Sequence, residues 1–150
     1  MGIIRSLAVN QGKQKPMLYE KKIKIIKNFG IEGDRFSKFN DSRQIMIVDG
    51  KLYDKYDLKT GVLRENILVD NIDLNSCQEG QIFSINDSLQ IKISLVKDAC
   101  ASVSYNDPDV IKQLKGNMYA FATPLQTGYI SIKDKMKLLW NFFIYLLWLD

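Results

Sequence analysis

Leu89-Gln90-Ile91-Lys92-Ile93-Ser94-Leu95 is the stretch of this 150-residue chain that best defines its architecture. Apolar and polar residues alternate, as in a β-strand with one buried and one solvent-facing side. The strand leads to a cysteine, Cys100, just beyond its end. A compact helix is expected next, because Asp107 can cap it, Pro108 suits its first position and Gly116 suits the left-handed position that ends it.

Cys100 is the candidate centre of function. A strand before it and a capped helix after it would hold it on a short loop, where reactive side chains are commonly displayed. The alternative is a small core residue, since free cysteine is among the most buried residue types. Reactivity depends on surroundings that favour the thiolate, so the local pattern leaves both interpretations open.

Short segments bounded by turn residues occur on both sides of this stretch. Those that alternate or are continuously apolar are expected to be strands, at 3–9, 21–29, 45–48, 67–69, 82–85, 118–122, 129–132 and 136–139. Helical spacing is found at 52–58. Many short strands, frequent turns and one or two short helices predict a mainly β protein built as a closed or nearly closed β-barrel.

The chain contains no histidine. Histidine is the commonest general base and metal ligand, so Cys-His and Ser-His-Asp catalysis are excluded within this chain. Two cysteines cannot form a four-thiolate zinc site, and zinc sites that need histidine are excluded because the chain has none. Any chemistry must use a cysteine, carboxylates, lysines or a cofactor supplied from outside.

The two cysteines, Cys77 and Cys100, form no CxxC pair. A chain of this size can fold as one domain without disulfides, and no signal peptide is evident at its start. A reducing, cytoplasmic setting is therefore expected. A disulfide between Cys77 and Cys100 is the less favoured alternative.

The net charge of +4 arises from 21 Lys and Arg against 17 Asp and Glu. Basic and aromatic residues are not interleaved as in nucleic-acid-binding proteins, so no nucleic-acid partner is expected. Six lysines fall between Lys13 and Lys27, with Glu20 the only acid among them. The favoured interpretation is a solvated strand edge that discourages edge-to-edge pairing, and the alternative is a phosphate-binding patch.

Three further segments combine polar residues with glycine or precede a strand. They are Gly30-Ile31-Glu32-Gly33-Asp34-Arg35, then Arg43-Gln44, then Gly61-Val62-Leu63-Arg64-Glu65-Asn66-Ile67. The two glycines of the first segment indicate a shaped loop. Polar residues at the mouth of a strand are costly to bury unless paired, so those of the third segment either hydrogen-bond within the protein or hold a ligand.

Taken in order, these segments and the lone Cys100 resemble the MOSC domain, named after the C-terminal domain of molybdenum cofactor sulfurase. The resemblance is to the short, free-standing bacterial members and covers roughly residues 3–139. The closing segments Leu114-Lys115-Gly116 and Gly128-Tyr129-Ile130 also look like the family. Two departures are visible: Phe36 stands where the family usually has histidine, and Lys133 where it usually has glycine.

The resemblance implies a MOSC-type β-barrel that binds the molybdenum cofactor (molybdopterin) or handles sulfur for it. Cys100 corresponds to the family's proposed metal-binding or sulfur-carrying thiol, so it is the implied catalytic residue and metal ligand. Thiolate is the soft ligand that molybdenum or sulfane sulfur requires.

The cofactor's phosphate would be bound by cationic groups. The candidates implied by the matching segments are Arg35, Arg43 and Arg64. Glu65 and Asn66 would hydrogen-bond the pterin or orient an arginine.

Two activities follow from the resemblance: reduction of small N-hydroxylated compounds, or sulfur transfer. Reduction would need an electron-donor protein, because nothing in the sequence binds flavin, haem or an iron-sulfur cluster. Sulfur transfer would need a PLP-dependent cysteine desulfurase or sulfurase. The alternative from another class is a non-catalytic β-barrel, a binding or interaction module with a structural cysteine.

Residues 140–150 form an apolar C-terminal extension to a MOSC domain expected over 1–139. The apolar run is too short to cross a bilayer as a helix, which needs about twenty residues. Preceding lysines and the bracketing Trp140 and Trp148 are compatible with a peripheral membrane anchor. Docking of residues 138–149 onto the barrel or a second subunit is an equal alternative, and an unusual terminus is a third.

Overall fold

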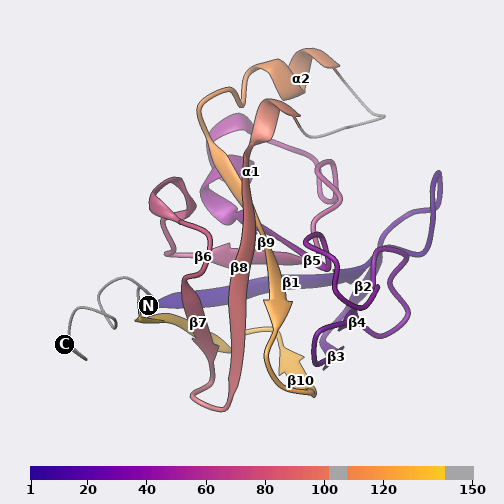
Figure 1. Cartoon of the computed structure of the whole chain (residues 1–150). Helices are drawn as coiled ribbons and strands as arrows, with labels where there is room; N and C mark the ends of the chain where they lie inside the picture. Colours follow the sequence, from indigo (N-terminus) through magenta and orange to yellow (C-terminus); the bar gives the residue numbers. More distant parts are fainter. Residues whose placement is uncertain (102–107, 141–150) are drawn as a thin grey trace.

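A closed seven-stranded β-barrel forms the centre of the computed structural model, which describes residues 1–101 and 108–140 (Figure 1). Around the ring the strands are β11 (Lys135–Trp140), β7 (Ile82–Ile85), β8 (Leu89–Asp98), β9 (Met118–Pro124), β5 (Ile45–Asp49), β6 (Ile67–Asp70) and β1 (Gly2–Val9). Pairing of Gly2 in β1 with Met136 in β11 closes the ring. Only β5 and β6 run parallel within it. The expected mainly β barrel is confirmed.

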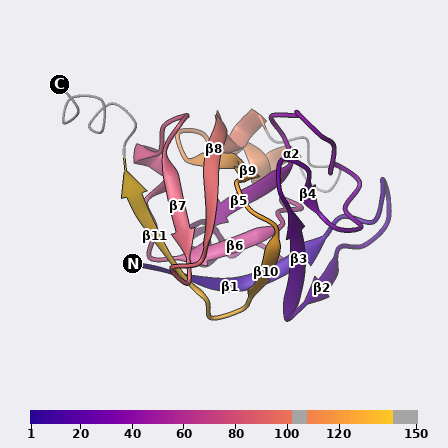
Figure 2. The same cartoon turned by 60° about the horizontal axis from the view of Figure 1, so that its bottom comes forward.

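Four strands lie outside the ring. β2 (Leu18–Glu20) extends the large sheet beyond β1, while β10 (Gly128–Ser131), β3 (Lys22–Ile26) and β4 (Gly30–Ile31) form a separate three-stranded sheet (Figure 2). The helical elements are short: α1 (Gly50–Tyr56), α2 (Pro108–Lys112) and the 3-10 turns η1 (Leu74–Ser76) and η2 (Ala99–Ala101). Gly116 ends the α2 region with a φ of +92°, as expected, whereas Asp107 lies outside the described residues.

The main hydrophobic core is formed by the inward-facing residues of the barrel. Along β8, Ile91 and Ile93 are buried and Lys92 between them is exposed, so the alternation expected of this strand is confirmed. Ile25 of β3 and Ile130 of β10 belong to the same cluster. The small sheet therefore packs its apolar face onto the barrel core.

A second hydrophobic cluster lies against the other face of β5 and β6. Ile47 and Ile67 belong to the main core, whereas Val48 and Leu68 belong to the second cluster. Both faces of these strands are therefore buried, which explains their continuous apolar runs. The remaining members of the second cluster come from α1, the 60s loop, η2, the α2 region and β9, and are Leu52, Tyr53, Leu63, Ala99, Ile111, Leu114 and Tyr119.

The lysine-rich segment and the two cysteines can now be compared with the interpretations drawn from the sequence. β3 is the central strand of its sheet, paired with β10 along Lys22–Ile25 and with β4 at Ile25 and Ile26. Lys22 and Lys24 thus have a paired strand only on the β10 side, and the interpretation of the lysines as a solvated strand edge stays a prediction. The less favoured Cys77–Cys100 disulfide is absent, since both thiols are free.

The C-terminal extension can be followed only to its first residue. β11 runs to Trp140, and residues 141–150 lie outside the described part of the chain. The proposed roles of 138–149 in membrane or subunit contact therefore stay predictions. Within residues 1–101 and 108–140, no helix is both long and apolar enough to span a bilayer.

Candidate functional site

Cys100 lies in η2, directly after β8, and its side chain is exposed. The interpretation of Cys100 as a core residue is therefore wrong. Cys77 takes that place instead: it is 8% exposed, belongs to the main core, and burial raises its pKa to about 11. The chain thus has one inert cysteine and one accessible cysteine.

Asp98 is the immediate partner of Cys100. Its carboxylate accepts the backbone N–H of Cys100 at 2.9 Å and that of Gly116 at 2.8 Å, and it also hydrogen-bonds the Cys100 thiol. This bond to the thiol raises the pKa of Cys100, while the same contacts lower the pKa of Asp98. In this state Cys100 is therefore held as a thiol, and its proton points to a carboxylate.

Sequence analysis missed Asp98. A signal for it existed, because an aspartate two residues before Cys100 can accept the N–H of that residue in an Asx turn. The turn holds η2 at the end of β8, and the second bond to Gly116 ties η2 to the segment after α2. Cys100 is thus positioned by two segments of the chain.

Of the polar residues in the third segment, Arg64 reaches outward. Its φ is +59°, and its guanidinium donates to the carbonyl oxygens of Lys15 (2.9 Å) and Gly12 (3.1 Å) and to Oδ1 of Asn10 (3.2 Å). These contacts fix the 10–15 loop over the mouth of β6. Toward the described residues Arg64 bonds through Nη2 alone, so Nε and Nη1 can serve a ligand.

Glu65 and Asn66 face inward and are 3% and 5% exposed. Glu65 accepts the Tyr53 hydroxyl at 2.6 Å. Asn66 accepts the N–H of Met46 at 2.9 Å and donates to Asp34 at 2.7 Å. Both side chains are therefore bound within the protein, which is one of the two outcomes that the sequence left open.

Asp34 connects the first predicted segment to the third. It is 7% exposed, and its Oδ2 accepts both Asn66 Nδ2 and the Asn10 N–H at 2.7 Å. Oδ1 accepts the N–H of Phe36 at 2.9 Å. Burial raises the pKa of Asp34 even though these hydrogen bonds act in the opposite direction. Asp34 is thus the centre of a buried network that shapes the glycine loop.

Arg35 and Arg43 are both exposed but lie against different surfaces. The Arg35 guanidinium lies 4.8 Å from the centroid of the Phe36 ring. Arg43 lies 5.7 Å from the centroid of Phe121, whose side chain packs against the second hydrophobic cluster. Both cations are therefore accessible to an anionic ligand.

The second hydrophobic cluster contains direct neighbours of three of the predicted residues. Leu63, directly before Arg64, and Ala99, directly before Cys100, are both members of it, and Arg43 reaches it through Phe121. Arg35 and Arg64 are linked instead through Asn10. Its carbonyl oxygen accepts the backbone N–H of Arg35, and its Oδ1 accepts the Arg64 guanidinium. Glu65 and Asn66 are turned away from solvent.

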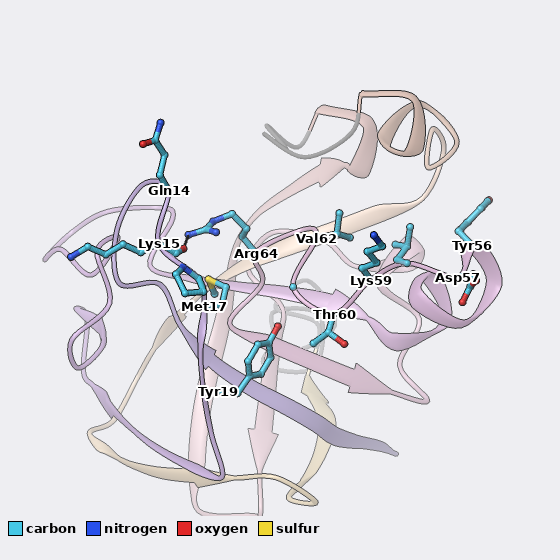
Figure 3. Close-up of a pocket in the computed structure, with 13 residues that line it drawn as sticks. Gln14, Lys15, Met17, Tyr19, Tyr56, Asp57, Lys59, Thr60, Val62 and Arg64 are labelled. Atoms are coloured by element: carbon cyan, nitrogen blue, oxygen red, sulfur yellow. Dashed lines mark hydrogen bonds between the residues drawn. The ribbon is translucent and has the colours of Figure 1, made fainter.

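A pocket of about 870 Å³ lies beside this region, between the 14–19 and 56–64 segments (Figure 3). Lys15, Lys59 and Arg64 are its cationic residues, and Tyr19 supplies an aromatic wall. Tyr56 lies at the rim of the pocket, and its hydroxyl accepts a 3.4 Å hydrogen bond from Asn117. Asn117 follows Gly116, whose N–H donates to Asp98, the partner of Cys100. The pocket could take an anionic ligand with an aromatic body.

Comparisons with known proteins give matches of structure only. No family model matches the chain, and no curated protein matches it by sequence. The solved structure of YuaD from Bacillus subtilis has a TM-score of 0.67 at 19% identity, covering 91% of this chain and 94% of that one. YiiM from Geobacillus stearothermophilus has a TM-score of 0.69 at 14% identity, covering 93% and 76%.

YiiM from Escherichia coli gives a TM-score of 0.62 at 14% identity, covering 93% of this chain and 70% of that one. At such identities the likeness shows the fold alone. YuaD and YiiM are MOSC-type proteins, and the fold of this chain is therefore MOSC-like.

Proposed function

We propose that this protein binds the molybdenum cofactor through Cys100 and reduces N-hydroxylated compounds in the reducing cytoplasm. The observation that carries the proposal is the exposed Cys100 thiol at the end of β8. Its neighbour Ala99 shares a hydrophobic cluster with Leu63, which precedes Arg64, and with Phe121, which contacts Arg43. A soft sulfur donor, the exposed Arg43 and the half-buried Arg64 fit a cofactor that combines molybdenum with an anionic phosphate.

Each of the predicted residues would have a separate role in cofactor binding. Cys100 would hold the metal, Arg43 and Arg64 would bind the phosphate, and Arg35 would extend the positive surface. Glu65 and Asn66 would support this arrangement from beneath, because their side chains are bound to Tyr53 and Asp34. When bound, the cofactor would supply two-electron reduction, with electrons from a separate donor protein.

Metal binding by Cys100 would release its thiol proton. The thiol donates a hydrogen bond to Asp98, which raises the pKa of Cys100, so cofactor binding is expected to strengthen as the pH rises. Asp98 would continue to fix η2 through the Cys100 and Gly116 N–H groups. It is therefore a positioning residue in this proposal.

The test is molybdenum and pterin analysis of protein purified from a host that synthesises the cofactor. We expect near-stoichiometric molybdenum in the wild type and its loss in Cys100→Ser. Cys77→Ala is the matched control, because it removes the buried cysteine and should leave the molybdenum content unchanged. Absence of molybdenum from the wild type would contradict the proposal.

The exposure of Cys100 also favours a second candidate function, that of a sulfur carrier. The Cys100 thiolate would attack the outer sulfur of a persulfide on a PLP-dependent desulfurase, forming Cys100–S–S⁻ and releasing the donor thiolate with no net redox change. Persulfide trapping on Cys100, with Cys77→Ala again as control, tests this function. A protein with neither molybdenum nor persulfide would be the non-catalytic barrel.

A further inference from the structure

The positive charge of the chain is concentrated in one segment. Residues 13–39 contain eight of the 21 basic side chains and three of the 17 acidic ones, a net charge of +5, whereas the rest of the chain carries −1. One of these three acids, Asp34, is buried in the network described above. The surface formed by this segment is therefore more positive than the net charge of +4 suggests.

The small sheet displays part of this charge on its outer surface. In β3, Ile23 and Ile25 pack inward, so Lys22 and Lys24 lie on the outer side. Lys24 is paired with Tyr129 of β10, and the Lys22 Nζ lies 4.7 Å from the centroid of the Tyr129 ring. Figure 2 shows β10, β3 and β4 side by side. We call the surface of Lys21, Lys22, Lys24, Lys27 and Tyr129 the basic face.

Exposed aromatic side chains adjoin the basic face. Tyr129 is 59% exposed, Phe36 49% and Phe39 61%. The loop that carries Phe36 and Phe39 is held to the end of β3, since the Lys38 N–H donates to the Phe29 carbonyl at 3.0 Å. Aromatic residues are enriched at protein interfaces.

Lys22 and Lys24 are paired with β10, whereas β4 pairs only with Ile25 and Ile26, so these lysines stand on the solvent-facing side of the small sheet. We propose that the basic face is a docking surface for a protein with an acidic surface. Charge complementarity of this kind speeds association and selects the partner. The partner's role as electron or sulfur donor rests on the proposed function, but the acidic surface does not.

The aromatic rings favour a protein over a nucleic acid or a membrane. Base stacking and membrane insertion both need rings that project freely. Here Lys22 lies over Tyr129, Arg35 lies over Phe36 at 4.8 Å, and Phe39 packs against Phe29 with a centroid distance of 4.7 Å. Each ring therefore lies against a cation or another ring of the protein itself. Such rings can contact the surface of a partner protein but are not free to insert between bases or lipids.

The test measures association of the full-length protein with two acidic probes, a purified flavodoxin and a plant-type ferredoxin. We expect Lys22→Glu/Lys24→Glu to slow association at least tenfold at low salt and to weaken its salt dependence. Lys92→Glu/Lys135→Glu makes the same charge change on exposed strand residues outside the basic face. This control should stay within about twofold of wild type, since local steering depends on the charges that face the partner.

Equal slowing in both double variants, or no association with either probe, would overturn the proposal. Binding of duplex DNA or phosphatidylserine vesicles through Lys22 and Lys24, without binding of the acidic proteins, would also overturn it. If Lys22→Glu/Lys24→Glu does not fold, Lys22→Gln/Lys24→Gln replaces it. Molybdenum content is measured on the same samples. A variant that no longer docks but keeps its molybdenum shows that the docking surface and the cofactor site are tested independently.

Discussion

Asp98 holds Cys100 at two points, because its carboxylate accepts the backbone N–H of Cys100 at 2.9 Å and hydrogen-bonds the thiol. The arrangement positions the accessible cysteine and at the same time suppresses its thiolate. A positioned but protonated thiol is protected from oxidation until a metal or a sulfur donor displaces its proton.

Asp98→Asn should make Cys100 more reactive. The amide keeps an oxygen for the Cys100 N–H but removes the negative charge that raises the pKa of the thiol. The thiolate fraction at pH 7.5 should increase, and the rate of alkylation by iodoacetamide should rise severalfold. Mass spectrometry of the labelled peptide over a pH series measures this change.

Asp73→Asn is the matched control for this experiment. Asp73 caps η1 by accepting the Asn75 N–H at 3.0 Å, the same i to i+2 contact that Asp98 makes. We expect no change in Cys100 alkylation. A Cys100 profile that is unaffected by Asp98→Asn would show that Asp98 does not control the thiol.

Glu65 should make the stability of the fold depend on pH. Burial raises its pKa from about 4.5 to about 7, so between these values the folded state binds more protons than the unfolded state. The free energy of unfolding should therefore decrease as the pH rises from about 4.5 to 7, by up to about 3 kcal/mol. Glu65→Gln stays neutral and can still accept the Tyr53 hydroxyl, so it should lose this dependence.

Urea unfolding of wild type and Glu65→Gln at pH 5, 6, 7 and 8 tests the prediction. The two proteins should be similar at pH 5, and the variant should be the more stable at pH 8. Tyr53→Phe is a useful comparison, because it removes the 2.6 Å hydrogen bond that lowers the pKa of Glu65. Parallel pH profiles of wild type and Glu65→Gln would contradict the assignment.

Asp34→Ala should destabilise the protein strongly. It would leave the buried Asn10 N–H, the part-buried Phe36 N–H and Asn66 Nδ2 without the Asp34 acceptor, and each unsatisfied buried group costs about 1–3 kcal/mol. We expect a loss of about 3 kcal/mol or more in denaturant unfolding. Asp41→Ala removes a single exposed contact, to the Arg43 N–H, and should cost less than about 1 kcal/mol. Similar losses in the two variants would argue against a central role of Asp34.

Gly61→Ala should disturb the pocket more than Gly33→Ala. Both glycines have a positive φ, +79° and +85°, so alanine is strained at each. A Cβ at Gly61 would lie 2.7 Å from the Tyr19 hydroxyl oxygen, whereas a Cβ at Gly33 would meet no atom within 4 Å. The difference in melting temperature between Gly61→Ala and Gly33→Ala measures the effect of the contact with Tyr19. Adding Tyr19→Phe, which removes the hydroxyl, should make this difference smaller. An equal effect at the two glycines would mean that backbone strain alone decides.

Much of the fold follows from local patterns. The alternation of Leu89 to Leu95 predicts β8 because a strand displays successive residues on opposite faces. The apolar run 45–48 predicts a strand buried on both sides, and the structure shows Ile47 and Val48 in different clusters. Among the positions that sequence singled out, Cys100 proved accessible and Cys77 buried.

The sequence by itself determined the strands of the barrel ring, the exclusion of histidine chemistry and the position of Cys100 after β8, because these depend on neighbouring residues and composition. It did not predict the short strands β2 and β4. Only the tertiary structure decided that Asp34 binds Asn66, that Glu65 is buried against Tyr53 and that β3 is a central strand. These contacts join residues distant in sequence, and they form only when the barrel closes and brings separate segments together.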